Sequence, residues 1–563
     1  MSYVRVKNII RQVGSMSEKN FMFCNFRPVT LLCWLFGIVV VLGFAGACSP
    51  QYHKADADKE VYQIIDSKWQ DDFGIKANYM ISDSNDPSSP NDVEIAEMIP
   101  ESGVINLQQA VEIATNFNRD YQSQKETLYK SALTLTGTRY DYALQWFGTI
   151  EGSYEDTKSN GDDVSIDARG GVDQQSLFLD GVLFNIGIAI DWTRFLTGDP
   201  RTTLHSVLSG DVAVPLLGRV AGRQAREDLT QDERDVLYAI RKFNRERKTF
   251  VIDIISGYYS VLQKRDEVDI TEASYKRQVE SVNQLKMEVD VGQRAPSDVD
   301  EAMQNLLSAE NKLVRDRQSY EQALDRFKIR LSLPTDANIT LDQNELKALE
   351  EIGISQPEYT EAEAMEMSLA LRLDLANTKD SLEDSARKLE LAAEGLGVQL
   401  DLIGSSDVSS ANKTGFDRLQ FQKGTYSLGL GADLPLDRKA ERNAYREALI
   451  SMEQRQRSYD DEFENVKLDV RQAYRDLAET GESYRIQKIG LELAIRRVEE
   501  QKMRLDTGRG VIRLLLQTED DLVKAQNDLT GALVNHTIAK MSFFRDVGIL
   551  QVKPDGMWEQ RTQ

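Results

Sequence analysis

The spacing of the prolines constrains the fold of this chain more than any other feature of its sequence. No proline lies between Pro215 and Pro296, or between Pro435 and Pro554, although the chain contains 12 prolines. A proline inside a helix costs about 3 kcal/mol, so these stretches are free to form very long helices. Each predicted helix has about 70 residues and a length on the order of 100 Å. They cover residues 222–291 and 439–507.

The apolar residues that follow each long helix recur with the period of a coiled coil. From Ala302 to Leu331, and again from Leu522 to Phe543, apolar side chains are spaced three or four positions apart with one polar exception. This spacing predicts a helical seam, and the alanines in both seams allow close helix approach. Each long helix is therefore expected to form a helical hairpin with the helix that follows it.

Alternating apolar and small or polar residues predict four β-strands in two places. The strands cover residues 182–192 and 205–216 in the first place, and 397–403 and 425–434 in the second. Residues 146–154 and 167–172 are weaker strand candidates in addition to these four. The lengths suit tilted transmembrane strands of about 9–11 residues. Two amphipathic hairpins in a soluble domain are the alternative interpretation.

The N-terminus carries the pattern of an exported bacterial lipoprotein. A basic segment precedes an uncharged run from Val29 to Ala47, and Cys48 follows directly. These parts predict a secretory signal peptide over residues 1–47. A cysteine after small residues resembles a lipobox, so Cys48 is the expected lipid-bearing N-terminus. An uncleaved signal anchor is the alternative, and Met16 or Met22 are alternative translation starts.

Charge and composition exclude several classes of function. The chain has 91 acidic and 68 basic residues and a formal net charge of -23, which argues against nucleic acid as a partner. With 41% hydrophobic and 28% charged residues it is not a bundle of transmembrane helices. No spacing typical of a metal site, a P-loop or a nucleophile–base pair occurs in the sequence. We therefore expect neither an enzyme nor a bound cofactor.

An internal duplication sets the predicted architecture. Residues 287–292 match residues 503–508, and at the same offset Phe327 aligns with Phe543. Each half reads as helix, strands, long helix, glycine turn and helix. The expected domains are an acidic lipid-anchored linker (48–106), a first repeat (107–333), a second linker (334–359), a second repeat (360–550) and a tail (551–563).

The duplicated order resembles the TolC-like family of outer-membrane efflux proteins across residues 107–550. The closest local matches are the runs 292–302 and 434–445, together with the strand-to-helix junctions at Pro215 and Pro435. The resemblance implies a mainly α fold with membrane β-structure, in which each protomer of a homotrimer contributes four strands to a 12-stranded outer-membrane β-barrel. The duplicated hairpins would continue this barrel into the periplasm as an α-barrel tunnel.

The same resemblance implies a passive channel of a tripartite efflux or type I secretion system. Such a channel sits in the outer-membrane lipid, binds a periplasmic adaptor protein, and carries small molecules, metals or proteins from an inner-membrane transporter. Two other classes also combine a lipoprotein signal with long helices. One is a periplasmic adaptor lipoprotein, and the other is a structural coiled-coil lipoprotein without a pore.

The turns at 292–298 and 508–514 are the implied periplasmic tip. The residues expected to contact an adaptor are Gly292, Arg294, Pro296, Ser297, Gly508, Arg509, Gly510 and Val511. The acidic ring that some family members carry in the second-repeat turn is absent, because Leu514 and Gln517 occupy its positions.

The first-repeat equivalents of those positions, Asp298 and Glu301, are acidic, so a gate involving them is one hypothesis. Arg509 or Arg513 would supply the opposite charge, and Leu514 would lie beside them. Helix capping by Asp298 after Pro296 is the simpler alternative.

Overall fold

The computed structural model divides the chain into two units, Met1–Glu60 and Val61–Gln563. It describes residues 49–76, 78–81, 99–100, 102–157, 163–178, 181–196, 202–217, 220–354, 359–411, 415–434, 436–507, 509–553 and 558–560. Cys48, the predicted lipid attachment site, lies outside the described residues. In the first unit the described part is the start of α2 (Pro50–Lys68), which continues into the second unit. All contacts below belong to the second unit.

Two long helical hairpins form the largest part of the second unit. The helix α6 (Val220–Asp290) has 71 residues and pairs with α7 (Pro296–Arg330), while α11 (Lys439–Asp506) has 68 residues and pairs with α12 (Ile512–Val547). At 1.5 Å per residue the two long helices are about 100 Å in length. They confirm the helices predicted from the proline spacing. Among the described residues, no helix combines the length and the apolar composition needed to cross a membrane.

Each repeat begins with a short helix followed by a longer one. The first repeat has α4 (Leu107–Phe117) and α5 (Arg119–Asp141), and the second has α9 (Glu361–Leu371) and α10 (Leu373–Glu394). Both short helices start with a capping box, in which the cap side chain and the third helical residue bond to each other's backbone. The duplication is therefore present in local structure as well as in sequence.

Smaller elements connect the repeats and complete their ends. They are η1 (Asp71–Phe73), β1 (Val104–Ile105), β6 (Thr340–Leu341), α8 (Asn344–Ile352), η3 (Phe416–Arg418), η4 (Phe421–Lys423), β9 (Leu550–Val552) and β10 (Trp558–Gln560). β1 pairs in parallel with β6, and β9 pairs antiparallel with β10.

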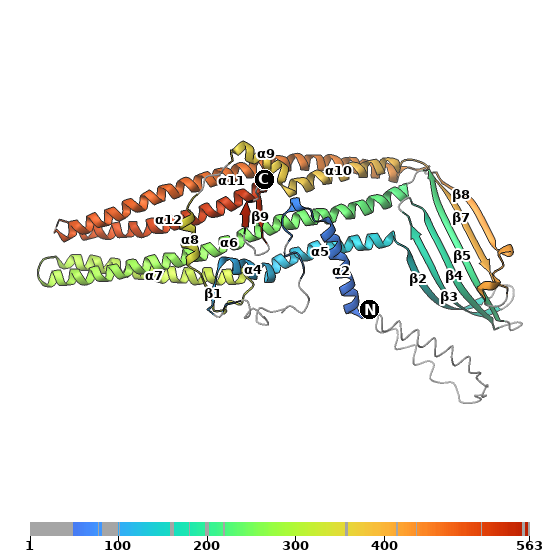
Figure 1. Cartoon of the computed structure of the whole chain (residues 1–563), viewed down its shortest axis with the longest axis horizontal. Helices are drawn as coiled ribbons and strands as arrows, with labels where there is room; N and C mark the ends of the chain where they lie inside the picture. Colours follow the sequence, from blue (N-terminus) through green and yellow to red (C-terminus); the bar gives the residue numbers. More distant parts are fainter. Residues whose placement is uncertain are drawn as a thin grey trace, which may run out of the picture. The chain divides into compact units, whose positions relative to one another are not determined.

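A single six-stranded antiparallel sheet contains all the longer strands. They are β2 (Gln145–Thr157), β3 (Asp163–Leu177), β4 (Leu183–Phe195), β5 (Thr202–Leu217), β7 (Gln399–Ser409) and β8 (Thr425–Asp433). The order is β2-β3-β4-β5-β7-β8, so the two repeats meet where β5 pairs with β7. Within the second unit the sheet lies at one end of the long helices and the hairpin turns lie at the other (Figure 1).

The sheet corrects the expected number of strands. The four predicted strands correspond to β4, β5, β7 and β8, and the two weaker candidates correspond to β2 and β3, which belong to the same sheet. Glycine and alanine occupy alternate positions on these two strands, for example Gly148, Gly152 and Ala168. Small residues weaken the apolar signal of a strand in the sequence. The regular pairing of β3 with β4 identifies it as a strand of this sheet despite its weak apolar pattern.

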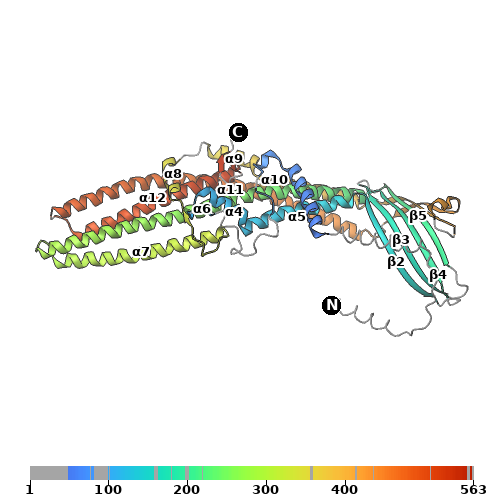
Figure 2. The same cartoon turned by 60° about the horizontal axis from the view of Figure 1, so that its bottom comes forward.

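Three apolar clusters hold the helices together. The largest lies where the short helices of both repeats meet the long hairpins, and it includes the fully buried rings of Tyr258 and Phe543. The second joins α2, α5 and α6 through residues such as Ile65, Leu128 and Ile240. The third lies near the hairpin turns. Figure 2 shows from a second direction that α6 runs beside α7 and α11 beside α12.

Candidate channel wall and hairpin tips

One face of the six-stranded sheet is apolar along its whole width. Directly opposed residues of antiparallel strands lie on the same face, and the register links Ile150 to Gly170 and Gly170 to Ile190. The larger side chains on this face are Trp146, Ile150, Tyr154, Ile166, Val172, Phe184, Ile186, Ile188, Ile190, Trp192, Leu204, Leu208, Val212, Leu402, Tyr426, Leu428 and Leu430.

Most of this face is not covered by another layer of the chain, although residues 415–424 cover Ser206 and Val408 at one end of it. Ile150 on the outer strand β2 is 94% exposed, Leu428 on the outer strand β8 is 78% exposed, and Ile188 in the middle of the sheet is 44% exposed. A continuous apolar face of this kind is unfavourable in water but suits contact with lipid. The strands have 9 to 16 residues, enough to cross the hydrocarbon core of an outer membrane.

The opposite face of the sheet is polar and acidic. Its carboxylates belong to Glu151, Glu155, Asp167, Asp173, Asp191, Asp211, Asp401 and Asp407. Among the described strand residues, Arg169 is the only arginine or lysine on this face, and its Nε lies 3.6 Å from Asp191 Oδ1. The sheet therefore has one face suited to lipid and one suited to water and cations.

The first hairpin turn depends on glycine for its backbone conformation. Gly292 has φ = +73°, in the left-handed region where glycine is favoured. Its N–H donates to the Val289 carbonyl at 2.9 Å, which helps to close the end of α6. Pro296 occupies the first turn of α7, where a missing N–H costs nothing.

The residue that caps the N-terminus of α7 is not Asp298, which was the simpler alternative to a gate. The N-cap is Ala295, without a side-chain hydrogen bond. Asp298 lies within the first turn, where its negative charge favours the helix dipole. Ser297 is exposed, and Asp298 and Glu301 are half-buried.

The second hairpin turn depends on glycine for close packing. A Cβ on Gly510 would lie 2.6 Å from the backbone nitrogen of Leu505, so a side chain does not fit there. Val511 is the N-cap of α12, and Arg509, Arg513 and Leu514 are exposed. Gly508 lies outside the described residues.

Arg294 connects the first hairpin turn to the end of α11 in the second hairpin. Arg294 Nη2 donates to the Leu505 carbonyl oxygen at 2.9 Å, and Arg294 Nε donates to Glu288 Oε2 at 3.2 Å. Within the described part of one chain, neither Arg509 nor Arg513 forms an ion pair with Asp298 or Glu301. The cross-hairpin contact therefore comes from the first-repeat turn and ends on a backbone carbonyl.

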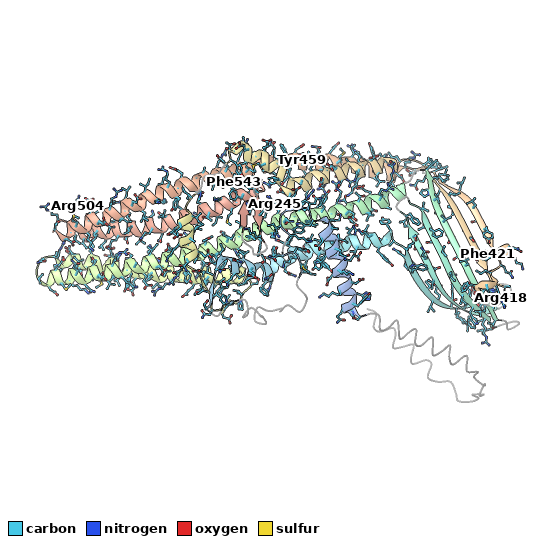
Figure 3. The ribbon with its side chains drawn as sticks, viewed as in Figure 1. Arg245, Arg418, Phe421, Tyr459, Arg504 and Phe543 are labelled. Atoms are coloured by element: carbon cyan, nitrogen blue, oxygen red, sulfur yellow. The ribbon has the colours of Figure 1, made fainter. Side chains whose placement is uncertain are left out.

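An apolar cluster surrounds this contact on the helix side. Its buried members are Val282, Leu285, Ala302, Ile512, Leu515 and Leu516. They come from both hairpins, so burial of apolar surface holds the hairpin ends together alongside the arginine. Figure 3 labels Arg504 at this end of the helices and Phe421 beside the sheet at the other.

A carboxyl group is buried beside the same cluster. Glu519 on α12 is 8% exposed, and among the described residues its Oε2 has no hydrogen-bond partner. Burial raises the pKa of Glu519 above its ordinary value, although the charges of Arg277 and Lys502 act in the opposite direction. No local pattern in the sequence predicts this burial, because an isolated glutamate on a charged helix is expected to be exposed to solvent.

A charged network joins the two repeats near the middle of the long helices. Arg245 on α6 lies 3.0 Å from Asp374, which also accepts from Arg372 at 2.7 Å. Arg372 also donates to Asp469 on α11 at 2.8 Å. Burial alone raises the pKa of Asp374, but the hydrogen bond from Arg372 and the charge of Arg245 outweigh it, so the pKa lies below its ordinary value.

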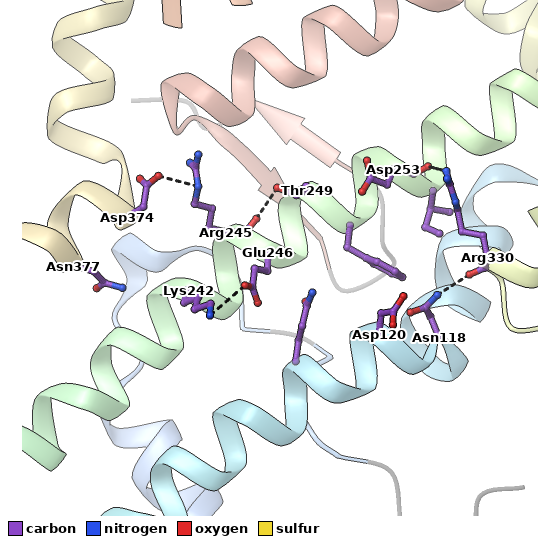
Figure 4. A pocket seen from close by; sticks show the side chains of 13 residues that line it. Asn118, Asp120, Lys242, Arg245, Glu246, Thr249, Asp253, Arg330, Asp374 and Asn377 are labelled. Atoms are coloured by element: carbon purple, nitrogen blue, oxygen red, sulfur yellow. Dashed lines mark hydrogen bonds and ion pairs between the residues drawn. The ribbon is translucent and has the colours of Figure 1, made fainter. Parts of the chain in front are cut away.

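This network borders a pocket of about 730 Å³ between α5, α6 and α10. Figure 4 shows Arg245 paired with Asp374, and Asn118 bonded to Arg330 across the pocket. Asn118 and Arg372 occupy the same position in the two repeats, directly after the short helix. Both join their repeat to a neighbouring helix, which indicates a structural role for this region.

Comparison with known proteins gives matches at the level of structure. No protein-family model matches the sequence, and no sequence among the curated proteins matches it. The solved outer-membrane channel OprN has a TM-score of 0.56 and 15% sequence identity to this chain, with 84% of this chain and 96% of OprN covered. The CmeC outer-membrane channel of Campylobacter jejuni has a TM-score of 0.55 and 13% identity, covering 88% of this chain and 93% of CmeC.

A third similar structure is the open state of the MtrE outer-membrane channel of Neisseria gonorrhoeae. Its TM-score is 0.56 at 14% identity, with 78% of this chain and 88% of MtrE covered. The chain therefore has the fold of the outer-membrane efflux channels, and the resemblance to the TolC-like family is confirmed for the fold.

Proposed function

We propose that the chain is the outer-membrane channel of an efflux or type I secretion system and acts as a passive export route. The observation that supports this proposal most strongly is the six-stranded sheet, which has one apolar face, one acidic face and two open edges. Helices about 100 Å long continue from the same sheet. A wall that faces lipid on one side and water on the other is what a membrane pore requires.

Closure of the pore requires more than one copy of the chain. The outer strands β2 and β8 each have a single strand partner in the described chain, so the other side of each exposes backbone N–H and C=O groups. In lipid an unsatisfied backbone group costs several kcal/mol. A homotrimer, as implied by the resemblance, would satisfy both edges by pairing each copy with the next.

The proposed location follows from the two ends of the structure. The sheet would lie in the outer membrane, and the helices would extend into the periplasm. Lipid attached to Cys48 would anchor the mature N-terminus to the same membrane. The turns around Gly292 and Gly510 would then face a periplasmic adaptor, and through it an inner-membrane transporter.

The entrance at the hairpin turns is the proposed point of control. Asp298, Glu301, Arg513 and Leu514 all lie in the first two turns of α7 and α12. Around a threefold axis their charges would be repeated three times, and pairs that one chain does not form would become available between neighbouring copies. Adaptor contacts made by Arg294, Pro296, Ser297, Arg509 and Val511 would compete with these pairs.

The two alternative classes do not account for the sheet. A periplasmic adaptor or a coiled-coil rod works in water, where exposed Ile150 and Leu428 would favour aggregation. Long hairpins alone are compatible with all three classes. The exposed apolar face is the observation that favours the channel.

Conductance across a planar lipid bilayer tests the proposal. The purified protein should form ion-conducting channels, and in a KCl gradient the reversal potential should show selectivity for potassium because carboxylates line the sheet's polar face. Replacing Asp173 and Asp211 together with asparagine should reduce that selectivity. Asp336→Asn, an exposed residue outside the sheet, is the matched control. Absence of conductance from a folded, lipid-inserted protein would contradict the proposed function.

A further inference from the structure

We propose that three copies of this chain close an eighteen-stranded barrel, because each contributes a six-stranded sheet. The inference rests on the proposed function and specifies the wall of the channel. It differs from the 12-stranded barrel that the sequence resemblance implied. An eighteen-stranded barrel requires that β2 and β3 belong to the barrel wall, whereas a 12-stranded barrel would leave them outside it.

The register places β2 and β3 in the wall. The β3–β4 ladder runs from Ser165 opposite Phe195 to Leu177 opposite Leu183 without a register shift. The β2–β3 ladder is equally regular, from Gln145 opposite Gln175 to Thr157 opposite Asp163. A hairpin that left the wall would require a break or a bulge at its junction with β4.

The side chains of β2 and β3 follow the same division between the two faces. Trp146, Ile150 and Tyr154 lie on the apolar face of β2, and Ile166 and Val172 lie on the same face of β3. The alternate positions of the same strands place Glu151, Glu155, Asp167 and Asp173 on the acidic face. Strands outside a barrel wall have no reason to keep lipid-facing and lumen-facing sides in step with the rest of the sheet.

The two open edges are complementary to each other. All neighbours in the sheet are antiparallel and the strand count is six, so β2 and β8 run in opposite directions. β8 of one copy therefore meets β2 of the next as an ordinary antiparallel pair. Each open edge of one copy is therefore paired with the opposite edge strand of a neighbouring copy, β2 with β8.

The width of six strands matches the helices that continue from them. The helices α5, α6, α10 and α11 connect directly to the sheet, and each packs on the next in that order. At a spacing of about 8–10 Å, four helices span about 32–40 Å of wall. Six strands about 4.8 Å apart and tilted by about 40° span about 38 Å, whereas four would span only about 25 Å.

The consequence is a wide lumen within the membrane. With the same spacing and tilt, an eighteen-stranded barrel has a backbone radius of about 18 Å, against about 12 Å for twelve strands. The barrel then continues the helical wall without narrowing. The acidic carboxylates of β2 and β3 line this lumen together with those of the other strands.

Cysteine cross-linking between neighbouring copies tests the inference. In the test pair, Ile150→Cys on β2 is combined with Tyr426→Cys, Leu428→Cys or Leu430→Cys on β8, because three positions cover different registers between copies. In the comparison pair, Ile188→Cys on β4 is combined with the same β8 positions. All these side chains are exposed, so the substitutions leave the core intact. A flexible bismaleimide is added to outer-membrane preparations, and denaturing gels are read for covalent dimers and trimers.

We expect covalent oligomers from the Ile150 pairs and none from the Ile188 pairs or from single-cysteine variants. Oligomers from the Ile188 pairs alone would mean that β4 forms the edge. That result would overturn the eighteen-stranded barrel but leave a four-strand channel intact. Absence of oligomers from both sets, with no conductance, would overturn the inference and the proposed function together.

Discussion

Replacement of Arg294 by alanine should separate the two hairpin turns and increase the time that the channel is open. Arg294 is the side chain that bonds across from the first turn to the Leu505 carbonyl, and it also pairs with Glu288. Only 16% of the Arg294 side chain and 25% of the Glu288 side chain are exposed, so solvent weakens these contacts only in part.

The size of the effect follows from these two contacts. A hydrogen bond from a charged donor contributes about 1.5–3 kcal/mol, and a partly exposed ion pair contributes less than about 1 kcal/mol. Water replaces part of both in the variant, which leaves a net loss of about 1–2 kcal/mol in each copy. A loss of this size shifts the equilibrium between joined and separated turns by about 5- to 30-fold.

Single-channel recording in planar bilayers measures this shift as open probability. Arg294→Ala should open more often than the wild type, while its selectivity should remain unchanged because the acidic sheet face is intact. Arg509→Ala is the matched control, since Arg509 is an exposed arginine in the equivalent turn. Equal open probability for Arg294→Ala and the wild type would refute the role given to this contact.

Three further substitutions test the second hairpin turn, the buried Glu519 and the lipid attachment site. Gly510→Ala should lower the melting temperature by overpacking against Leu505, at a cost of about 1–3 kcal/mol, whereas Gly490→Ala inside α11 should not; equal melting temperatures for both would contradict the packing argument. Glu519→Gln should stabilise the protein at neutral pH, as measured by thermal unfolding. Burial raises the folded pKa of Glu519 above its ordinary value of 4.5, so the stability cost of ionisation is absent below pH 4.5 and grows as the pH rises from there towards the folded pKa. A benefit of the glutamine that is equally large at low pH would contradict this cause. Cys48→Ser should abolish lipid attachment and leave unprocessed precursor, as read by mass spectrometry; a correctly lipidated N-terminus in that variant would exclude Cys48 as the site.

The long hairpins were predictable from the sequence because their signals are local and repeated. The gap between Pro215 and Pro296 bounds α6, and the matching turn 216 residues later fixes the second hairpin. Four of the six strands were predictable for the same reason. The remaining two were only weaker candidates, because they carry glycine and alanine at alternate positions such as Gly148 and Ala168. Their identity as strands depends on the pairing of β2 with β3 and of β3 with β4.

The details of the hairpin turns were predictable only in part. The need for glycine at 292 follows from the turn, but the partner of Arg294 is a backbone carbonyl in the other repeat, which has no signature in sequence. Charge placement alone suggested Arg509 and Arg513 as the cross-hairpin residues. Burial of Glu519 likewise depends on how two hairpins that are distant in sequence pack together, so no local sequence pattern predicts it.

A cryo-electron microscopy reconstruction of the full-length protein in lipid nanodiscs tests the central claim most directly. We expect a threefold-symmetric particle with a hollow centre, in which the sheets form a closed wall within the lipid disc and the long helices extend from one side of it. The apolar side chains around Ile150 and Ile190 should face the lipid, and Asp173 and Asp211 should face the lumen. A particle without a central lumen, or one with its sheets outside the lipid, would contradict the proposal that this chain forms an outer-membrane channel.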